Sequence, residues 1–162
     1  MKDITLHLTF MRILNEFSKL SHCVSKKVAA MAVKDGRIIA TGINGTAPGY
    51  TNCDDIFDAA SFDRDLHHQF SNTYEVHAEM NMILYAAKNG ISLNGATLYC
   101  SMMPCWNCIK HISVTGVKTI IYSTKYDMLS EKDEYAIQEY CSRLGIQLMY
   151  LNIDEMEQSY DK

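Results

Sequence analysis

Apolar residues near the start of the chain recur at the spacing of an amphipathic helix. Five of them fall on one helical face, which predicts a helix over residues 4–20. Two apolar runs follow, VAAMAV and RIIATGI, with Asp35-Gly36 between them. An Asp-Gly pair between two such runs is typical of a tight turn, so we expect a β-hairpin. The residues on the helical face are Phe10, Ile13, Leu14, Phe17 and Leu20.

From residue 77 onward, helical and strand patterns alternate. Strand-like runs occur at ATLYCS, KTIIYS and IQLMYL, and helical periodicity occurs in HAEMNMILYAAKNG, PCWNCIKHISVTG and EKDEYAIQEYCSRLG. The first of these helices should end near Asn89-Gly90, and the second should open at Pro104 and close near Gly116. Strands that alternate with helices pair in parallel, whereas the opening hairpin is antiparallel. The pattern predicts an α/β fold, a mixed sheet with helices on both faces.

Residues 44–74 show neither pattern, because Gly, Pro, Asn, Asp and His are scattered through them. A connection of about 30 residues with little secondary structure is uncommon inside a compact domain and usually serves a function. An organising element such as a bound metal ion would explain such a segment.

The composition is that of one globular domain. The chain has 162 residues, 48% of them hydrophobic and 21% charged, which is enough for a sizeable core. We expect a single domain over residues 1–153 and a polar tail over residues 154–162. The net charge is −4, and the longest basic block is Lys26-Lys27. These features argue against binding to a long nucleic acid.

The chain shows no signal for export or membrane insertion. There is no run of 18 apolar residues, so no membrane span is expected. Asp3, His7 and Arg12 interrupt the N-terminal segment, which lacks the apolar core of a signal peptide. We therefore expect a cytoplasmic protein. Six cysteines in a reducing compartment point to metal ligands or buried thiols before disulfides.

Two short motifs carry the strongest chemical signal. PCWNC places Cys105 and Cys108 three residues apart in the first turn of a predicted helix, so both sulfurs can reach one ion. His77 begins another predicted helix, and the strand ATLYC lies between the two. If the helix N-termini meet at one sheet edge, these three side chains can hold a zinc ion and leave its fourth position open to water. A C-x-x-C pair alone would equally suit a redox dithiol.

Glu79 completes the pattern. The order His-x-Glu and then Pro-Cys-x-x-Cys is the signature of zinc nucleobase deaminases, and both halves are present here. Zinc lowers the pKa of its bound water to about 7. Glu79 can take the water's proton and pass it to the ring nitrogen and the leaving amine. A carboxylate on the metal could not carry protons in this way, so we expect a catalytic Glu79 beside the zinc.

From about residue 1 to 150, the chain resembles the deoxycytidylate (dCMP) deaminase family, most of all its phage-type members. The resemblance rests on the zinc signature, the G-x-N-G loop GING, the segment HAEMN and the segment STKYD. It implies a three-layer cytidine deaminase-like fold with a five-stranded sheet. It also implies hydrolysis of dCMP to dUMP and ammonia, in the host cytoplasm if the chain is phage-encoded. By resemblance, Asn44 contacts the deoxyribose, Ser101 lines the base site, and Tyr126 helps to hold the nucleotide.

The resemblance further implies a second, structural zinc. In phage-type members, two cysteines, a histidine and a glutamate ahead of the catalytic motif hold this ion. The matching residues here are Cys23, Cys53, His67 and Glu75, with His68 as the rival of His67. Four protein ligands close a zinc site, and a metal there would pin the long connection to the first helix. Without a metal, Cys23 and Cys53 would be small buried residues and Glu75 a solvated carboxylate.

The family is often hexameric and regulated by nucleotides. dCTP activates it and dTTP inhibits it, with Mg²⁺ on the triphosphate. The resemblance therefore implies a homo-oligomer, with effector contacts at Gly42, Asn44, Gly45, Tyr85 and Lys88. Phage-type members carry arginine where Lys88 stands, and lysine cannot make a bidentate grip on phosphate.

Two alternatives stay open. A zinc deaminase of cytidine, guanine or a tRNA adenosine would use the same catalytic residues, although the acidic charge disfavours tRNA. A non-catalytic zinc-binding module would keep the fold as an interaction surface. Glu79 argues against it, because a structural zinc has no need of a carboxylate that moves protons.

Overall fold

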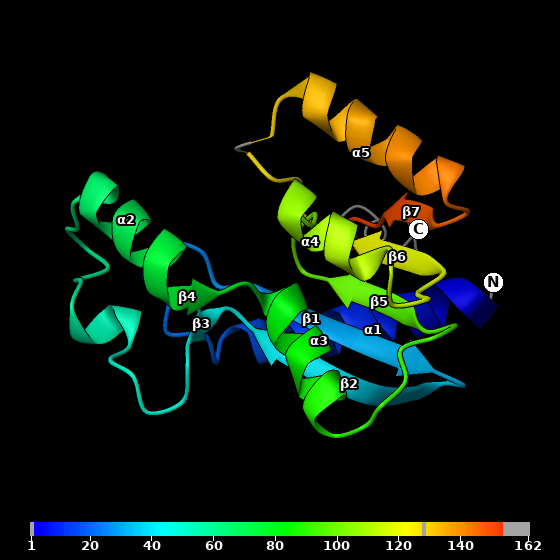
Figure 1. Ribbon diagram of the computed structural model, residues 1–162, viewed down its shortest axis with the longest axis horizontal. Coiled ribbons are helices and arrows are strands. Elements are labelled where there is room, and N and C mark those ends of the chain that lie inside the picture. Colours follow the sequence, from blue (N-terminus) through cyan, green and yellow to red (C-terminus); the bar gives the residue numbers. More distant parts are fainter. Residues whose placement is uncertain (1, 128, 154–162) are drawn as a thin grey trace, which may run out of the picture.

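A five-stranded sheet forms the centre of the molecule in the computed structural model, which describes residues 2–127 and 129–153 (Figure 1). The strand order is β2-β1-β5-β6-β7. β1 is antiparallel to β2 and to β5, whereas β5, β6 and β7 run parallel. The predicted mixed sheet is confirmed. The strands are β1 (Ala29–Lys34), β2 (Arg37–Ile43), β5 (Thr97–Cys100), β6 (Thr119–Tyr122) and β7 (Gln147–Tyr150).

Helices cover both faces of this sheet, which gives three layers (Figure 1). Because side chains alternate along a strand, β1 serves both layers. Ala30 and Ala32 pack into the core formed with α3, α4 and α5, whereas Met31 and Val33 pack into the core formed with α1. The helices are α1 (Lys2–Ser18), α3 (Ala78–Lys88), α4 (Trp106–Ile112) and α5 (Glu131–Arg143).

Several local signals act as expected. Asp35 and Gly36 join β1 to β2 with φ of 51° and 72°, the pair of positive values that a type I′ hairpin turn requires. Asn89 caps α3, and Gly90 follows with φ of 65°. α4 differs from its prediction, because Cys105 is its N-cap and Pro104 lies before it. In the described residues, no helix combines the length and apolarity that a membrane span needs.

A smaller region lies at one end of the molecule, beyond the start of α3 (Figure 1). Here the expectation of little secondary structure over residues 44–74 is wrong, because an 11-residue helix fills the second half. The Asp63 carboxylate caps this helix by accepting hydrogen bonds from the backbone N–H groups of Asp65 and Leu66. The elements of the smaller region are β3 (Gly45–Thr46), the 3₁₀ turn η1 (Cys53–Asp55), this helix, α2 (Arg64–Tyr74), and β4 (Glu75–Val76).

The helix α2 escaped prediction because it is polar overall, and its few apolar residues, Leu66, Phe70 and Tyr74, stand among Asp, His, Gln, Asn and Ser. Only His67 and Phe70 are buried among its 11 residues. Phe70 packs with Cys23 and Cys53 in a small cluster separate from the two main cores. The tail predicted over residues 154–162 lies outside the described residues.

Candidate active site

His77 and Cys105 each stand immediately before a helix. His77 is the N-cap of α3, Cys105 is the N-cap of α4, and the two helices contact each other on one face of the sheet. Cys108 lies in the first turn of α4. The two helix N-termini therefore meet, and each contributes partial positive charge that favours anionic ligands.

Three ligand atoms converge at this meeting point. Cys105 Sγ lies 3.6 Å and Cys108 Sγ lies 3.5 Å from His77 Nδ1. All three ligand atoms lie within 4.8 Å of one another. One imidazole nitrogen and two sulfurs are a donor set that suits zinc, and three protein ligands leave a position open.

The two thiols influence each other strongly. The pKa of Cys105 is lowered to about 4, chiefly by its hydrogen-bonding contact with the Cys108 side chain and also by its contact with His77. The pKa of Cys108 is raised, first by its bond to Cys105 and then by burial. One thiolate thus keeps the other thiol protonated. A divalent cation between the sulfurs would let both ionise, so the pair fits a metal.

Glu79 lies beside these three residues with only 4% of its surface exposed. The Cys108 thiol donates to Glu79 Oε2 at 3.5 Å. Burial raises the pKa of the Glu79 carboxyl, because the charged form is poorly solvated there. Glu79 does not belong to the described group of metal-ligand candidates. This is the placement expected of a proton carrier beside a metal, and its catalytic role stays a prediction.

A cavity of about 420 Å³ opens beside this cluster, within the range of small-molecule sites. His77, Glu79 and Cys105 line it, and so do the cations Lys26 and Arg64. Sequence reasoning missed both cations, because no motif marks them. Lys26 precedes β1 and Arg64 begins α2, and only the fold shows that they share a cavity with the catalytic motif.

Tyr126 lines the same cavity, as expected for a nucleotide contact. Lys26 Nζ lies 5.4 Å from the centroid of its ring and 2.7 Å from Asp127 Oδ2. Ser101 is not among the described residues that line the cavity. Its Oγ accepts a hydrogen bond from the backbone N–H of Ala29 at 2.9 Å, which ties β1 to the end of β5. Contact between Ser101 and a base stays a prediction.

Asn44 lines the cavity, but its amide group is engaged with residues 21–28. Oδ1 accepts from Ser21 Oγ at 2.7 Å and from the backbone N–H of Val28 at 2.8 Å. Nδ2 donates to the backbone oxygen of Lys26 at 2.8 Å. Asn44 therefore shapes the segment that carries Lys26, and its predicted contact with deoxyribose is untested.

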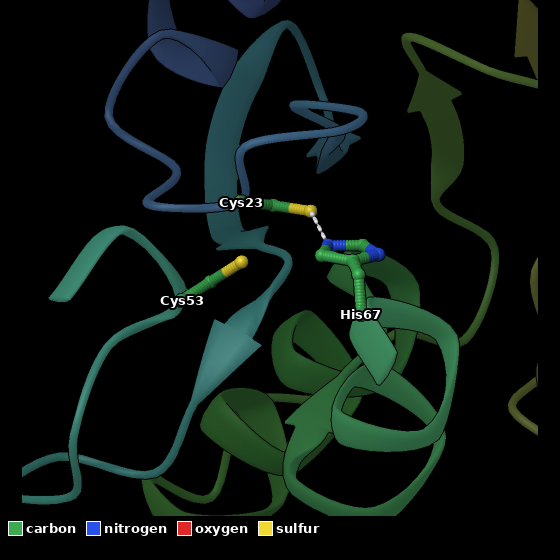
Figure 2. A group of neighbouring side chains, drawn as sticks. All are labelled: Cys23, Cys53 and His67. Atoms are coloured by element: carbon green, nitrogen blue, oxygen red, sulfur yellow. Dashed lines mark hydrogen bonds between the residues drawn. The ribbon is translucent and has the colours of Figure 1, made fainter. Parts of the chain in front are cut away.

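A second cluster lies in the smaller region, where Cys23, Cys53 and His67 face one another from three separate segments (Figure 2). All three are buried, with their ligand atoms within 4.8 Å of one another. Cys23 Sγ lies 3.6 Å from His67 Nε2. His68 is exposed and contacts Asn72, so the structure places His67 and not His68 in the cluster.

Glu75 lies on β4, outside the 4.8 Å group. In the described part of the chain, both of its carboxylate oxygens are buried and lack a hydrogen-bond partner. The pKa of Cys53 is raised to about 11, first by burial and in smaller part by the charges of Cys23 and Glu75. A buried carboxylate without a partner is costly, and a nearby cation relieves that cost. The solvated Glu75 considered from the sequence does not fit these buried oxygens.

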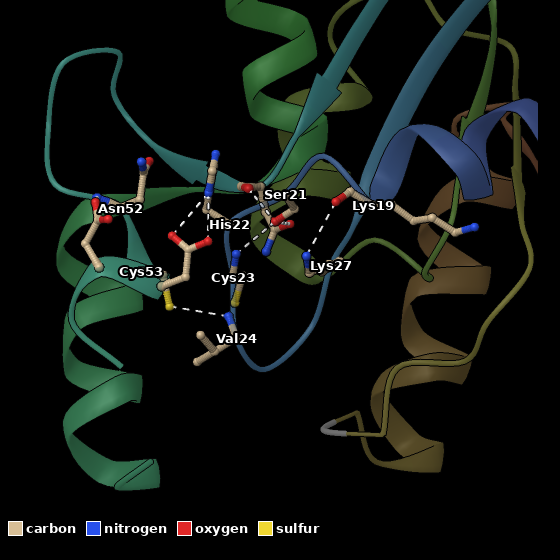
Figure 3. A network of polar contacts seen from close by, with 11 residues as sticks. Lys19, Ser21, His22, Cys23, Val24, Lys27, Asn52 and Cys53 are labelled. Carbon is tan, nitrogen blue, oxygen red and sulfur yellow. Dashed lines mark hydrogen bonds and ion pairs between the residues drawn. The ribbon is translucent and has the colours of Figure 1, made fainter. Parts of the chain in front are cut away.

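Polar contacts bring the segment after α1 against η1 (Figure 3). The backbone N–H of Val24 donates to Cys53 Sγ at 3.5 Å. His22 Nδ1 lies 2.9 Å from Asp54 Oδ2. These contacts hold Cys23 close to Cys53.

The residues expected to contact effectors lie on two segments, the GING segment and the helix α3. Gly42 lies against the backbone of α3, whereas a Cβ atom added at Gly45 would have no atom within 4 Å among the described residues other than its chain neighbours. Tyr85 and Lys88 are exposed and do not belong to the described cavity lining. Lys88 lies about 16 Å from His77 along the axis of α3, because an α-helix rises 1.5 Å per residue. The binding of effectors, the Mg²⁺ ion on an effector triphosphate and the homo-oligomer stay predictions.

Comparison with known proteins agrees with this geometry. Residues 4–124 match the family described as cytidine and deoxycytidylate deaminase zinc-binding region. The deoxycytidylate deaminase of Enterobacteria phage T2 is 36% identical over 150 residues, which covers 74% of this chain and 80% of that protein.

Two crystal structures of the dCMP deaminase from cyanophage S-TIM5 share the fold at 30% identity. The apo form has a TM-score of 0.71 and covers 93% of this chain and 100% of that one. The complex with dCMP and dUMP has a TM-score of 0.70 and covers 88% and 94%. These matches confirm the expected deaminase fold. The chain belongs to the cytidine and deoxycytidylate deaminase zinc-binding family.

Proposed function

We propose that the protein is a zinc-dependent deaminase that converts dCMP to dUMP and ammonia, and so supplies dUMP for dTMP synthesis. The observation that carries the proposal is the convergence of His77, Cys105 and Cys108 beside buried Glu79 in one cavity. The family supports the reaction. The relatives from phage T2 and cyanophage S-TIM5, both named as deaminases of dCMP, support the substrate.

The reaction replaces the amine on C4 of cytosine with the oxygen of water. A zinc ion held by His77, Cys105 and Cys108 would supply Lewis-acid chemistry by lowering the pKa of water in its open position to about 7. Glu79 accepts the proton of the attacking water and delivers it to ring nitrogen N3. It then carries the second proton to the amine, which leaves as ammonia. The raised pKa of Glu79 suits this role, because a carboxyl must hold each proton before passing it on.

Lys26 and Arg64 supply the charge that a nucleotide monophosphate requires. Both line the cavity that also holds the catalytic residues. Asp127, which does not belong to the described cavity lining, forms an ion pair with the Lys26 ammonium group. A phosphate would form charge-assisted hydrogen bonds with both cations, whereas a nucleoside has no group for them. We therefore assign the 5′-phosphate of dCMP to this wall.

The phosphate assignment is tested by Lys26→Ala and Arg64→Ala. Each should raise the KM for dCMP by roughly 10-fold to 100-fold, the worth of a hydrogen bond to a charged group, with little change in kcat. Activity on deoxycytidine should stay the same. Lys27→Ala is the matched control, because Lys27 is adjacent in sequence but does not belong to the described cavity lining. Equal losses on dCMP and deoxycytidine would contradict the assignment.

A second zinc in the smaller region would have a structural role. Cys23, Cys53 and His67 already converge there, and the buried carboxylate of Glu75 needs a cation. Four protein ligands leave no open position, so this ion would hold α2 and η1 to the segment after α1. Metal analysis of the purified chain should find about two zinc ions per chain, and a count of one would overturn the second site.

Ammonia release tests the substrate directly. The zinc-loaded chain should be assayed on dCMP, dCTP, cytidine and deoxycytidine under one set of conditions. We expect the highest kcat/KM for dCMP, because this substrate alone presents a cytosine, a deoxyribose and a single phosphate to the cavity. A clear preference for any other member of the panel would overturn the substrate assignment.

A further inference from the structure

Two buried polar side chains oppose each other in the smaller region. Thr46 and Glu75 are direct partners in the antiparallel pair β3–β4. Direct partners in such a pair project to the same side, with Cβ atoms about 4.5–5.5 Å apart. In the described part of the chain, the Thr46 hydroxyl and the two Glu75 oxygens are the buried side-chain polar atoms without a hydrogen-bond partner.

The two groups are chemically complementary. A threonine hydroxyl has one hydrogen to donate, and an ionised carboxylate only accepts. Buried polar groups in folded proteins are nearly always paired. The Thr46 hydroxyl is an unpaired donor and the directly opposed Glu75 carboxylate is an unpaired acceptor. The two groups are therefore placed to form a hydrogen bond with each other once Glu75 takes up its position as a metal ligand.

A metal ion bound by the neighbouring cysteine cluster would complete the site. Cys23, Cys53 and His67 have their ligand atoms within 4.8 Å of one another, and Glu75 stands outside that group. Glu75 is therefore the ligand that has to be oriented toward the ion. Carboxylates that bind metals through one oxygen are themselves hydrogen-bonded by neighbouring groups. Thr46 is the opposed side chain that can donate that bond.

We propose that Thr46 is a positioning residue of the second metal site. Its hydroxyl donates to the Glu75 oxygen that does not bind the ion and so holds Glu75 as the fourth ligand. Thr46 itself does not bind the metal. The inference rests on the proposed second zinc, and it is independent of which nucleotide the catalytic site accepts.

Competition for zinc tests the role of Thr46. The zinc-loaded full chain is titrated with a chromogenic chelator, in the wild type and in Thr46→Val and Thr46→Ser. Thr46→Val removes the donor and keeps a branched side chain, and it should weaken the second zinc by about 10-fold to 100-fold. Thr46→Ser keeps the donor and should retain zinc close to the wild-type affinity. The catalytic zinc should be unchanged in both.

A second measurement separates positioning from a general structural effect. Thr46→Val should lower the Tm only in the zinc-loaded chain, and it should have no further effect on zinc affinity in a Glu75→Gln background. Unchanged zinc affinity in Thr46→Val, or an equal loss of Tm in the zinc-free chain, would overturn the inference. A wild-type chain with one zinc would overturn the second site and this inference together. Failure of dCMP turnover would leave both standing, because no readout here is activity.

Discussion

Replacing Gly42 with alanine tests how closely β2 packs on α3, the helix that carries the catalytic motif. A Cβ atom at Gly42 would lie 2.3 Å from the backbone oxygen of Ala78 and 2.5 Å from the backbone nitrogen of Met82. Heavy atoms in good contact are about 3.5–4.0 Å apart. The strand and the helix would therefore have to separate by about 1 Å, because backbone atoms cannot rotate away as a side chain can.

The expected loss follows from this displacement. Overpacking usually costs about 1–3 kcal/mol, and a clash with backbone belongs at the upper end, so we expect about 3 kcal/mol. For a chain of this size the Tm should fall by about 6–12 °C. His77 and Glu79 stand at the start of α3, and a catalytic group displaced by about 1 Å can lose about 10²-fold in rate. We expect a loss of that order in kcat on dCMP.

Gly45→Ala is the matched control, because Gly45 lies three residues further along the same GING segment and, among the described residues other than its chain neighbours, no atom lies within 4 Å of the new Cβ. Thermal unfolding, zinc content and turnover of dCMP should be measured for both variants. Gly45→Ala should resemble the wild type in all three. A Gly42→Ala chain with the Tm and kcat of Gly45→Ala would refute the close packing of β2 on α3. The predicted effector contact would then be the remaining role for Gly42.

Three further variants test other parts of the structure. Glu79→Gln should keep the catalytic zinc and lower kcat by about 10²-fold to 10⁴-fold, because an amide cannot accept the water's proton; near-normal turnover in an ammonia assay would remove the proton-carrier role. Cys53→Ser should lower the zinc content by about one ion per chain and reduce the Tm while the catalytic zinc stays; unchanged metal content would contradict that. Tyr99→Phe removes a buried hydroxyl that lies 2.6 Å from His7 Nδ1, and it should cost about 1 kcal/mol in urea unfolding with unchanged kcat. A loss of kcat in Tyr99→Phe would show that this pair matters to the site.

Local sequence signals were sufficient to predict much of the fold and the convergence of His77, Cys105 and Cys108. Asp35-Gly36 marks its turn because few residues tolerate two positive φ values in succession. Cys105 and Cys108 could be paired because residues three apart share a helical face. His77 could be placed beside them because its predicted helix and the PCWNC helix flank the strand ATLYC in sequence, so their N-termini can meet at one sheet edge.

Other features depend on contacts between distant segments. Lys26 and Arg64 show no spacing or motif, and only folding brings them to one cavity. His67 and His68 are equivalent in sequence, yet about 100° of rotation along α2 buries one and exposes the other. α2 itself is polar, and it is stabilised by packing of Phe70 with the cysteine cluster more than by its own pattern.

Chromatography of the products formed from dCMP tests the central claim most directly. The wild-type chain and Glu79→Gln should be compared at equal zinc content, with ammonia measured in the same samples. The wild type should convert dCMP to dUMP with one ammonia released per dUMP, and Glu79→Gln should leave dCMP nearly unchanged. A zinc-loaded wild-type chain that leaves dCMP intact, or equal dUMP formation by both chains, would contradict the account.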